Sequence, residues 1–190
     1  MPRTFVPFDV TVCGIQELPG HCGAGVSHVL SILDPEHPGL DVFGRYGEHE
    51  RLELRFHDII EERHGLVPPQ SEHVEAILAL GRDLLAEPEA CRHLLVHCHM
   101  GISRSTAALI MLLAQARPER PAADAVAAIA GIRTETWPNL RMIEFADALL
   151  GRDGDLVAAV RARHRDYARR RPEMITFMRD NHRGREVEGL

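Results

Sequence analysis

A ten-residue stretch in the middle of the chain decides the fold: His97-Cys98-His99-Met100-Gly101-Ile102-Ser103-Arg104-Ser105-Thr106. The short apolar run over residues 93–97 predicts a buried central strand that ends at the cysteine. Residues 104–114 are apolar on nearly every side and predict a helix buried in the core. A strand, a short loop and a helix start in this order predict a cradle of backbone N–H groups that binds an anion.

The residue types in this stretch give the predicted cradle a chemistry. Cys98 lies at its base, where the N–H groups stabilise a thiolate, the form of cysteine that acts as a nucleophile. The guanidinium of Arg104 can fold back over the same cavity, and its planar fork suits two oxygens of a phosphoryl group. Gly101 permits the tight turn. The Ser105 hydroxyl is expected close to the sulfur, where it stabilises a leaving thiolate, and His97 is expected to orient the loop through a hydrogen bond.

These residues resemble the signature of the protein tyrosine phosphatase superfamily, which is His-Cys, five residues, Arg, and then Ser or Thr. The inner Gly-x-Ser-Arg-Ser run is most similar to the dual-specificity branch. Residues 137–141 and 146–152 are also similar to small bacterial members, so the resemblance extends from residue 8 to about residue 160. It implies a cysteine-phosphatase fold and a phosphate-binding P-loop formed by His99, Met100, Gly101, Ile102, Ser103 and Arg104.

A carboxylic acid is the next expected part of the site, because cleavage of a phosphate ester needs a proton donor for the departing oxygen. The resemblance implies that this acid lies on a movable loop, and the mid-chain position of Cys98 indicates a loop upstream of it. Asp58 is our candidate, since it follows a predicted strand. Glu61 and Glu62 are close alternatives and Asp41 is a weaker one. A solvated loop carboxylate or a helix cap is the non-catalytic interpretation of Asp58.

We expect neither a metal ion nor another cofactor. Arg104 and the ring of N–H groups supply the charge stabilisation that a metal gives in other enzymes. His97 and His99 are near neighbours at a strand end and point in different directions, so His99 is expected to line the pocket mouth instead. The four cysteines contain no Cys-x-x-Cys pair, which is typical neither of a zinc site nor of a redox motif.

The remaining pattern predicts one α/β domain with a short, mostly parallel central sheet of about four to five strands flanked by helices on both sides. Ser71 and Asn139 are interpreted as N-caps. Residues 1–160 are interpreted as a dual-specificity-like domain and residues 161–190 as its basic helical extension. The expected strands are 8–13, 26–33, 51–56 and 93–97; the expected helices are 71–86, 104–114, 121–132, 139–150 and 155–171; the expected loops are 34–47 and 57–70; residues 14–25 and the tail from 172 are expected to be loop or short helix.

The composition limits the classes of protein to consider. The 190 residues are 45% hydrophobic and 26% charged, as in soluble globular domains. All 22 basic residues are arginine, a bias typical of a GC-rich bacterial genome. The net charge of −6 argues against general nucleic-acid binding. No apolar run is long enough for a membrane span or a signal peptide, so we expect a cytoplasmic protein without stable membrane association.

Together with the resemblance, these observations predict a metal-independent hydrolase that forms a phosphocysteine intermediate. The first hypothesis is a protein tyrosine or dual-specificity phosphatase acting on a phosphorylated protein or a small phosphorylated substrate. The second is a phosphoinositide, inositol phosphate or nucleotide phosphatase of the same superfamily, although within the loop only His99 offers a further basic group. The third is an inactive phosphate-binding module. The arginine clusters at 161–165 and 169–171 are interpreted as a solvated helix face.

Overall fold

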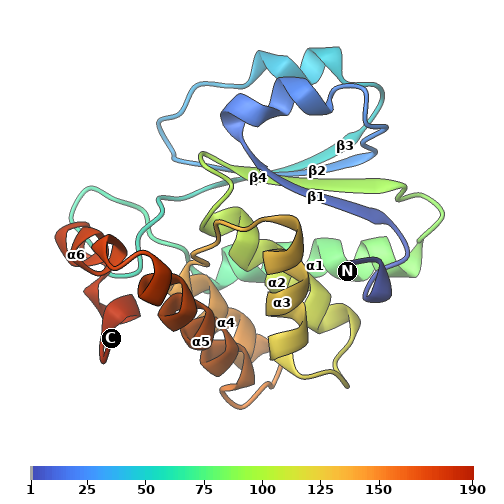
Figure 1. Ribbon diagram of the computed structural model, residues 1–190. Coiled ribbons are helices and arrows are strands. Elements are labelled where there is room, and N and C mark those ends of the chain that lie inside the picture. The colour runs from blue at the N-terminus through green and yellow to red at the C-terminus, as the bar shows by residue number, and fades with distance from the viewer. Residues whose placement is uncertain (1) are drawn as a thin grey trace.

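A four-stranded parallel sheet forms the centre of the computed structural model, which describes residues 2–190 (Figure 1). The strands are β1 (Asp9–Gly14), β2 (His28–Leu33), β3 (Glu50–Arg55) and β4 (His93–Cys98). The α-helices in these residues are α1 (Ser71–Ala86), α2 (Arg104–Ala116), α3 (Ala122–Ile132), α4 (Leu140–Leu149), α5 (Asp155–Arg170) and α6 (Glu173–Asp180). The 3-10 helices are η1 (Pro2–Thr4), η2 (Ile15–His21), η3 (Asp41–Arg45) and η4 (Gly184–Val187).

The strand order β1-β4-β2-β3 places β4 inside the sheet. Every neighbouring pair is parallel, and β4 pairs with β1 on one side and with β2 on the other. The predicted sheet of four to five mostly parallel strands and the predicted central position of residues 93–97 are therefore confirmed. Because the carboxyl ends of parallel strands meet at one edge, the loops that follow all four strands gather around the end of β4.

Helices cover both faces of the sheet, as expected, but the two covers differ in kind (Figure 1). The α-helices lie on one face, and the 3-10 helices η2 and η3 lie on the other. On that second face, Leu18 and Phe43 pack with Val29 and Leu95 of the strands. The prediction of an irregular loop over residues 34–47 was therefore wrong for η3, which forms because the apolar Phe43 has a sheet face to cover.

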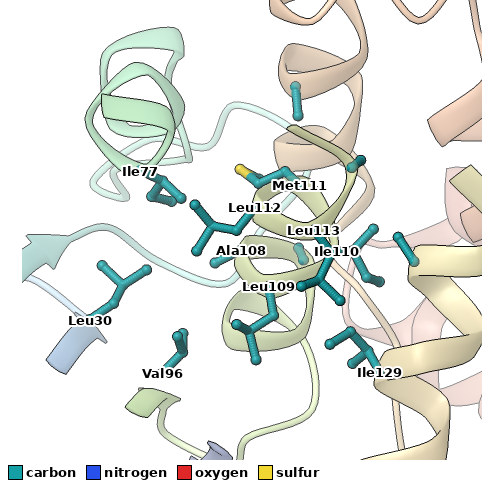
Figure 2. Close-up of a cluster of buried hydrophobic side chains, with 14 of the residues drawn as sticks. Leu30, Ile77, Val96, Ala108, Leu109, Ile110, Met111, Leu112, Leu113 and Ile129 are labelled. Carbon is teal, nitrogen blue, oxygen red and sulfur yellow. The ribbon is translucent and has the colours of Figure 1, made fainter. Parts of the chain in front are cut away.

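Helix α2 forms the middle of the main core. Every residue from Arg104 to Ala114 is buried, as its largely apolar sequence predicts. Its side chains fill the space between Leu30 and Val96 of the sheet, Ile77 of α1 and Ile129 of α3 (Figure 2). Truncation of a leucine to alanine in such a core costs about 2–5 kcal/mol of unfolding free energy. This packing fixes the start of α2 relative to the end of β4.

One helix start differs from its prediction. The N-cap of α1 is Gln70 and not Ser71, whose hydroxyl bonds the carboxylate of Glu75 at 2.8 Å instead of a backbone N–H. At the other end of the chain, the tail from residue 172 was expected to be loop or short helix, and it forms α6 and η4. Helix α5 matches the expected helix 155–171 to within one residue. No helix in residues 2–190 combines the length and the apolarity needed to cross a bilayer.

Candidate active site

The loop between β4 and α2 lies directly against the end of β1. Gly101 has a φ of +70°, and a Cβ on it would lie 2.5 Å from the carbonyl carbon of Cys13. A Cβ on Gly14 would lie 2.8 Å from the carbonyl oxygen of His99. Both positions therefore require glycine, one for its left-handed backbone and both for the close approach of the two chains.

The loop is held from outside by its carbonyl groups. The oxygen of His99 accepts from the Ile15 N–H at 3.0 Å, and that of Ile102 accepts from the Trp137 N–H at 2.9 Å. The N–H groups of residues 100–103 find no acceptor within residues 2–190. A loop whose carbonyls are occupied and whose N–H groups are not is suited to bind an anion.

Cys98 ends β4 at the base of this loop. It is buried, with 3% of its surface exposed, and its Sγ lies 3.2 Å from the Oγ of Ser105 in the first turn of α2. The structure thus places the serine hydroxyl where the sequence analysis expected it. A hydroxyl at this distance can donate a hydrogen bond to a thiolate. All four cysteines of the chain are free thiols.

The guanidinium of Arg104 is buried and only partly used. Its NH1 donates to Asp34 Oδ1 at 2.6 Å and to the carbonyl oxygen of Phe56 at 2.5 Å. Its Nε is buried and has no partner among the described residues. A buried N–H without a partner is costly, so this edge of the guanidinium favours the binding of an acceptor. Two oxygens of a phosphoryl group would fit it.

Asp34 is a site residue that the sequence analysis missed. It directly follows β2, and its carboxylate anchors Arg104. A signal was present, because the carboxyl ends of adjacent parallel strands meet and β2 was predicted correctly. What the sequence did not supply was the strand order that makes β2 a neighbour of β4.

Asp58 lies in the loop after β3 and is fixed through one of its two oxygens. Its Oδ1 accepts from Ser103 Oγ at 2.7 Å, from Asn139 Nδ2 at 2.9 Å and from Arg183 NH1 at 3.1 Å. No partner of Oδ2 is found in the described part of the chain. Three donors on Oδ1 leave Oδ2 as the oxygen that can carry a proton. Asn139 also caps α4 through the Met142 N–H, as predicted.

The surroundings of Asp58 set its ionisation. Burial raises its pKa, but the charges of Arg183 and Arg104 and the hydrogen bonds from Asn139 and Ser103 outweigh burial and hold the pKa below its ordinary value. Asp58 is therefore a carboxylate at neutral pH, and its proton is available in acid.

The alternative acids lie elsewhere. Glu61 pairs with Arg185 at 2.6 Å, and its side chain is 52% exposed. Glu62 is still more exposed and reaches Arg141. Asp41 belongs to η3, on the far face of the sheet. Of these carboxylates, Asp58 alone lines the cavity above Cys98.

The histidines of the signature differ in their contacts. Both ring nitrogens of His97 are buried without a hydrogen-bond partner, so the expected hydrogen bond was wrong; the ring packs against Phe43, 5.6 Å between centroids. Burial lowers the pKa of His97 to about 4. His99 lines the cavity, as expected, and its Nε2 accepts from the Asp34 N–H at 3.3 Å. Within residues 2–190 no group of three or more His, Cys, Asp or Glu side chains is placed to hold a metal ion.

Comparison with solved structures fits this geometry. The chain is similar to Tk-PTP in its active form, with 18% identity, a TM-score of 0.53 and coverage of 76% of this chain and 92% of that one. For human DUSP28 the identity is 14%, the TM-score 0.54 and the coverage 75% and 94%. For PTPMT1 in complex with PI(5)P the values are 15%, 0.53, 79% and 93%. The chain has the fold of the cysteine-dependent phosphatases. Scans of protein-family models and of curated sequences found no match.

In this phosphatase fold a cavity of about 380 Å³ opens above Cys98 and Arg104. Two kinds of side chain line it. The loop and Asp58 form a polar base, and a wall of apolar and arginine side chains rises on one side. Much of that wall comes from the end of the chain: Tyr167, Arg171, Met174, Phe177, Met178 and Arg183.

This wall is the second feature that the sequence analysis missed. The arginine clusters at 161–165 and 169–171 were interpreted as a solvated face, and Arg169 and Arg171 are indeed exposed and paired with nearby carboxylates. Arg183, for which no role was predicted, is only 6% exposed and reaches Asp58. The sequence carries no signal for this contact, since an arginine near a glutamate three residues on is typical of a surface helix.

Proposed function

We propose that this chain is a cysteine-dependent phosphomonoester hydrolase that acts through a phosphocysteine intermediate. One observation carries the proposal: Cys98 and Arg104 line one cavity, and the buried Nε of Arg104 has no partner among the described residues. An anion between the sulfur and this guanidinium would also meet the unoccupied N–H groups of the loop. The likeness to solved phosphatases supports the proposal through the fold.

In the first step, the Cys98 thiolate attacks phosphorus and the ester P–O bond breaks. The bonding electrons go to the departing oxygen, and the proton on Oδ2 of Asp58 neutralises it. Arg104 and the loop N–H groups hold the equatorial phosphoryl oxygens throughout, which stabilises the transition state. The products are the free alcohol or phenol, phosphocysteine and an Asp58 carboxylate.

In the second step, water attacks phosphorus and the S–P bond breaks. The carboxylate of Asp58 accepts the proton of the water, which restores the acid for the next cycle. The electrons of the S–P bond return to Cys98, and the Ser105 hydroxyl, 3.2 Å away, stabilises the thiolate that forms. Inorganic phosphate then leaves.

A phosphorylated protein is the substrate we favour, with phosphotyrosine first. The wall of Trp137, Tyr167 and Phe177 beside the loop gives an aromatic ring apolar contacts that an alkyl phosphate would lack. A phosphoinositide is the second candidate, and two observations favour it. PTPMT1 with bound PI(5)P is a similar structure, and Phe177 and Met100 expose 54% and 67% of their surface at the rim.

Turnover of 4-nitrophenyl phosphate in the presence of EDTA tests the chemistry. We expect the wild type to release 4-nitrophenol, and Cys98→Ser to lose about 10³-fold or more of the rate. The matched control is Cys91→Ser, a second buried thiol that is outside the cavity, which should stay near wild type. Full activity of Cys98→Ser would refute the mechanism. Binding of vanadate without any turnover would instead support the inactive-module hypothesis.

Substrate capture distinguishes the candidates. The Cys98→Ser protein retains the cavity and Arg104, so it should hold substrates that it does not cleave. We expect phosphotyrosine peptides to bind more tightly than matched phosphoserine peptides and than vesicles containing phosphoinositide. Preferential retention of the vesicles would replace the protein substrate by a lipid.

A further inference from the structure

The end of the chain packs on the active site as a structured unit. Met178 and Val187 are buried in a small cluster with Trp137, Tyr167 and Ala168, separate from the main core. Figure 1 shows α6 beside the loop that follows β3. The buried apolar contacts indicate that this segment holds a defined position relative to the site.

Arg183, between α6 and η4, is the charged centre of this unit. Its NH1 lies 3.1 Å from Asp58 Oδ1, and its NH2 donates to Ser103 Oγ at 3.1 Å. Ser103 in turn donates to the same Oδ1. One guanidinium therefore contacts both the proposed acid and the phosphate-binding loop.

Glu186 holds Arg183 from the other side. Its two carboxylate oxygens accept from the Nε and NH2 of Arg183, each at 2.8 Å. They also accept from the indole N–H of Trp137 at 2.7 Å and from the backbone N–H of Leu140 at 2.9 Å. A buried ion pair contributes little net stability, so a fully bonded pair at this place points to a role in geometry.

We propose that Arg183 is a positioning residue for the reaction: it fixes Oδ1 of Asp58 against the loop and thereby directs the proton of the acid to Oδ2. The segment from Pro172 to Leu190 is then a part of the active site and not an appended tail. This inference rests on the proposed function in so far as Asp58 is the acid.

Several charged or titratable groups face Asp58 from the elements packed around it. Arg183 approaches from the tail, Arg104 from α2 and His99 from the loop, and their charges interact with the carboxylate. The groove on its outer side is also lined by Arg63, Asp180 and His182. Arg183 and Arg104 lower the pKa of Asp58 against the opposing effect of burial. Removal of the Arg183 charge should therefore raise this pKa.

The direction of the pH effect follows from the mechanism. The first step needs protonated Asp58, so kcat/KM falls as pH rises through the pKa of this group. A higher pKa in an Arg183 variant moves that fall to higher pH. A misplaced acid also slows the cleavage of esters whose leaving group needs a proton. The cleavage of an ester whose leaving group is stable as an anion does not depend on the acid.

The experiment compares Arg183→Met with Arg183→Lys on two substrates, phenyl phosphate and 2,4-dinitrophenyl phosphate. We expect Arg183→Met to lose about 10- to 100-fold of kcat/KM on phenyl phosphate and little on the dinitrophenyl ester. Arg183→Lys should recover part of the loss. The matched control is Arg185→Gln, in the same segment and bonded to Glu61 and Glu144, which should leave the ratio of the two substrates unchanged.

An equal loss on both substrates, or an unchanged descending limb of the pH profile, would overturn the inference. If Arg183→Met fails to fold because it leaves Glu186 unpaired, the double variant Arg183→Met/Glu186→Gln removes both charges and gives the same test. Asp58→Asn separates the two hypotheses: if it leaves the substrate ratio unchanged, the assignment of the acid is wrong, and if it alone changes the ratio, only the role of Arg183 is wrong. A ¹³C titration of the Asp58 carboxyl reads the pKa change without turnover, and an unchanged pKa in Arg183→Met would refute the inference.

Discussion

The carboxylate of Asp34 lies 2.6 Å from NH1 of Arg104 and joins the end of β2 to the start of α2. The same NH1 also donates to the Phe56 carbonyl oxygen, while the Nε of Arg104 has no partner in residues 2–190. Asp34 therefore anchors Arg104 through NH1 and leaves its Nε available to an anion. A buried arginine held in this way is preorganised for a bidentate contact.

The first prediction concerns this anchor. Asp34→Asn should weaken the affinity for vanadate about 10-fold and raise KM, because the guanidinium loses its charged partner and part of its preorganisation. Inhibition kinetics measure the change. Asp9→Asn is a suitable control, since Asp9 forms an exposed pair with Arg3 at 2.6 Å far from the site. Wild-type affinity in Asp34→Asn would show that the loop alone positions Arg104.

The second prediction concerns the pH dependence of the acid. The pKa of Asp58 lies below its ordinary value, because Arg183 and Arg104 outweigh burial. The first step uses the protonated form, so kcat/KM should be highest in acid and fall as pH rises. Asp58→Asn should lower the rate on phenyl phosphate by about 10²-fold and remove this falling limb. Steady-state kinetics across pH check both effects.

Glu61→Gln and Glu62→Gln are the controls for this prediction. Both side chains are exposed and bonded to arginines outside the cavity. Each variant should keep the falling limb and most of the rate. Loss of the limb in either one would transfer the acid role from Asp58 to that glutamate.

The third prediction separates the two chemical steps. Ser105→Ala removes the hydroxyl that lies 3.2 Å from the sulfur of Cys98. The second step should slow about 10-fold, because the departing thiolate loses a hydrogen bond, and phosphocysteine should accumulate. A burst of 4-nitrophenol in rapid-mixing experiments detects it. Ser31→Ala, at a buried hydroxyl without a partner in the described residues, should give no burst. A uniform slowing without a burst would contradict the assignment.

The fourth prediction concerns stability in acid. His164 is fully buried, stacks on Trp137 with 4.3 Å between ring centroids, and bonds the Pro138 carbonyl through Nε2 at 3.0 Å. Burial lowers its pKa to about 4 from the ordinary value of 6.5. Between these values the unfolded chain binds a proton that the folded protein excludes, so stability falls as pH drops through this window.

His164→Gln keeps a donor for the Pro138 carbonyl and removes the titration. We expect its unfolding free energy to change less between pH 7 and pH 5 than that of the wild type, by about 2 kcal/mol. Urea unfolding at the two pH values measures this difference. His64→Gln, on the exposed loop after β3, should behave as wild type does. If the unfolding free energy of His164→Gln depends on pH as that of the wild type does, the loss of stability in acid does not come from the buried His164.

Local patterns predicted much of the fold and the centre of the site. The run before Cys98 and the apolar helix after it specify strand, loop and helix within one continuous stretch, and Gly101 fits the turn that joins them. Helices α1 to α5 follow from their apolar patterns, and α4 also from its N-cap Asn139. Such features depend on residues that are close together in the sequence, so the sequence alone is enough to predict them.

The missed residues share one property: their roles depend on long-range packing. Asp34 reaches Arg104 because β2 lies beside β4, and the sequence of neither strand specifies this strand order. Arg183 and Glu186 look like a surface pair three residues apart, and only the tertiary structure buries them against Trp137. His97 was expected to form a polar contact and instead packs on Phe43, because η3 covers that face of the sheet.

The side chains that hold Arg104 and Asp58 come from positions as far apart as 34 and 183. No short fragment of the chain contains all of them, so the site depends on contacts between residues that are far apart in the sequence. Such contacts form slowly because long loops must close first. During refolding from urea, helix content should therefore return before catalytic competence, and recovered turnover would report completion of the whole tertiary structure.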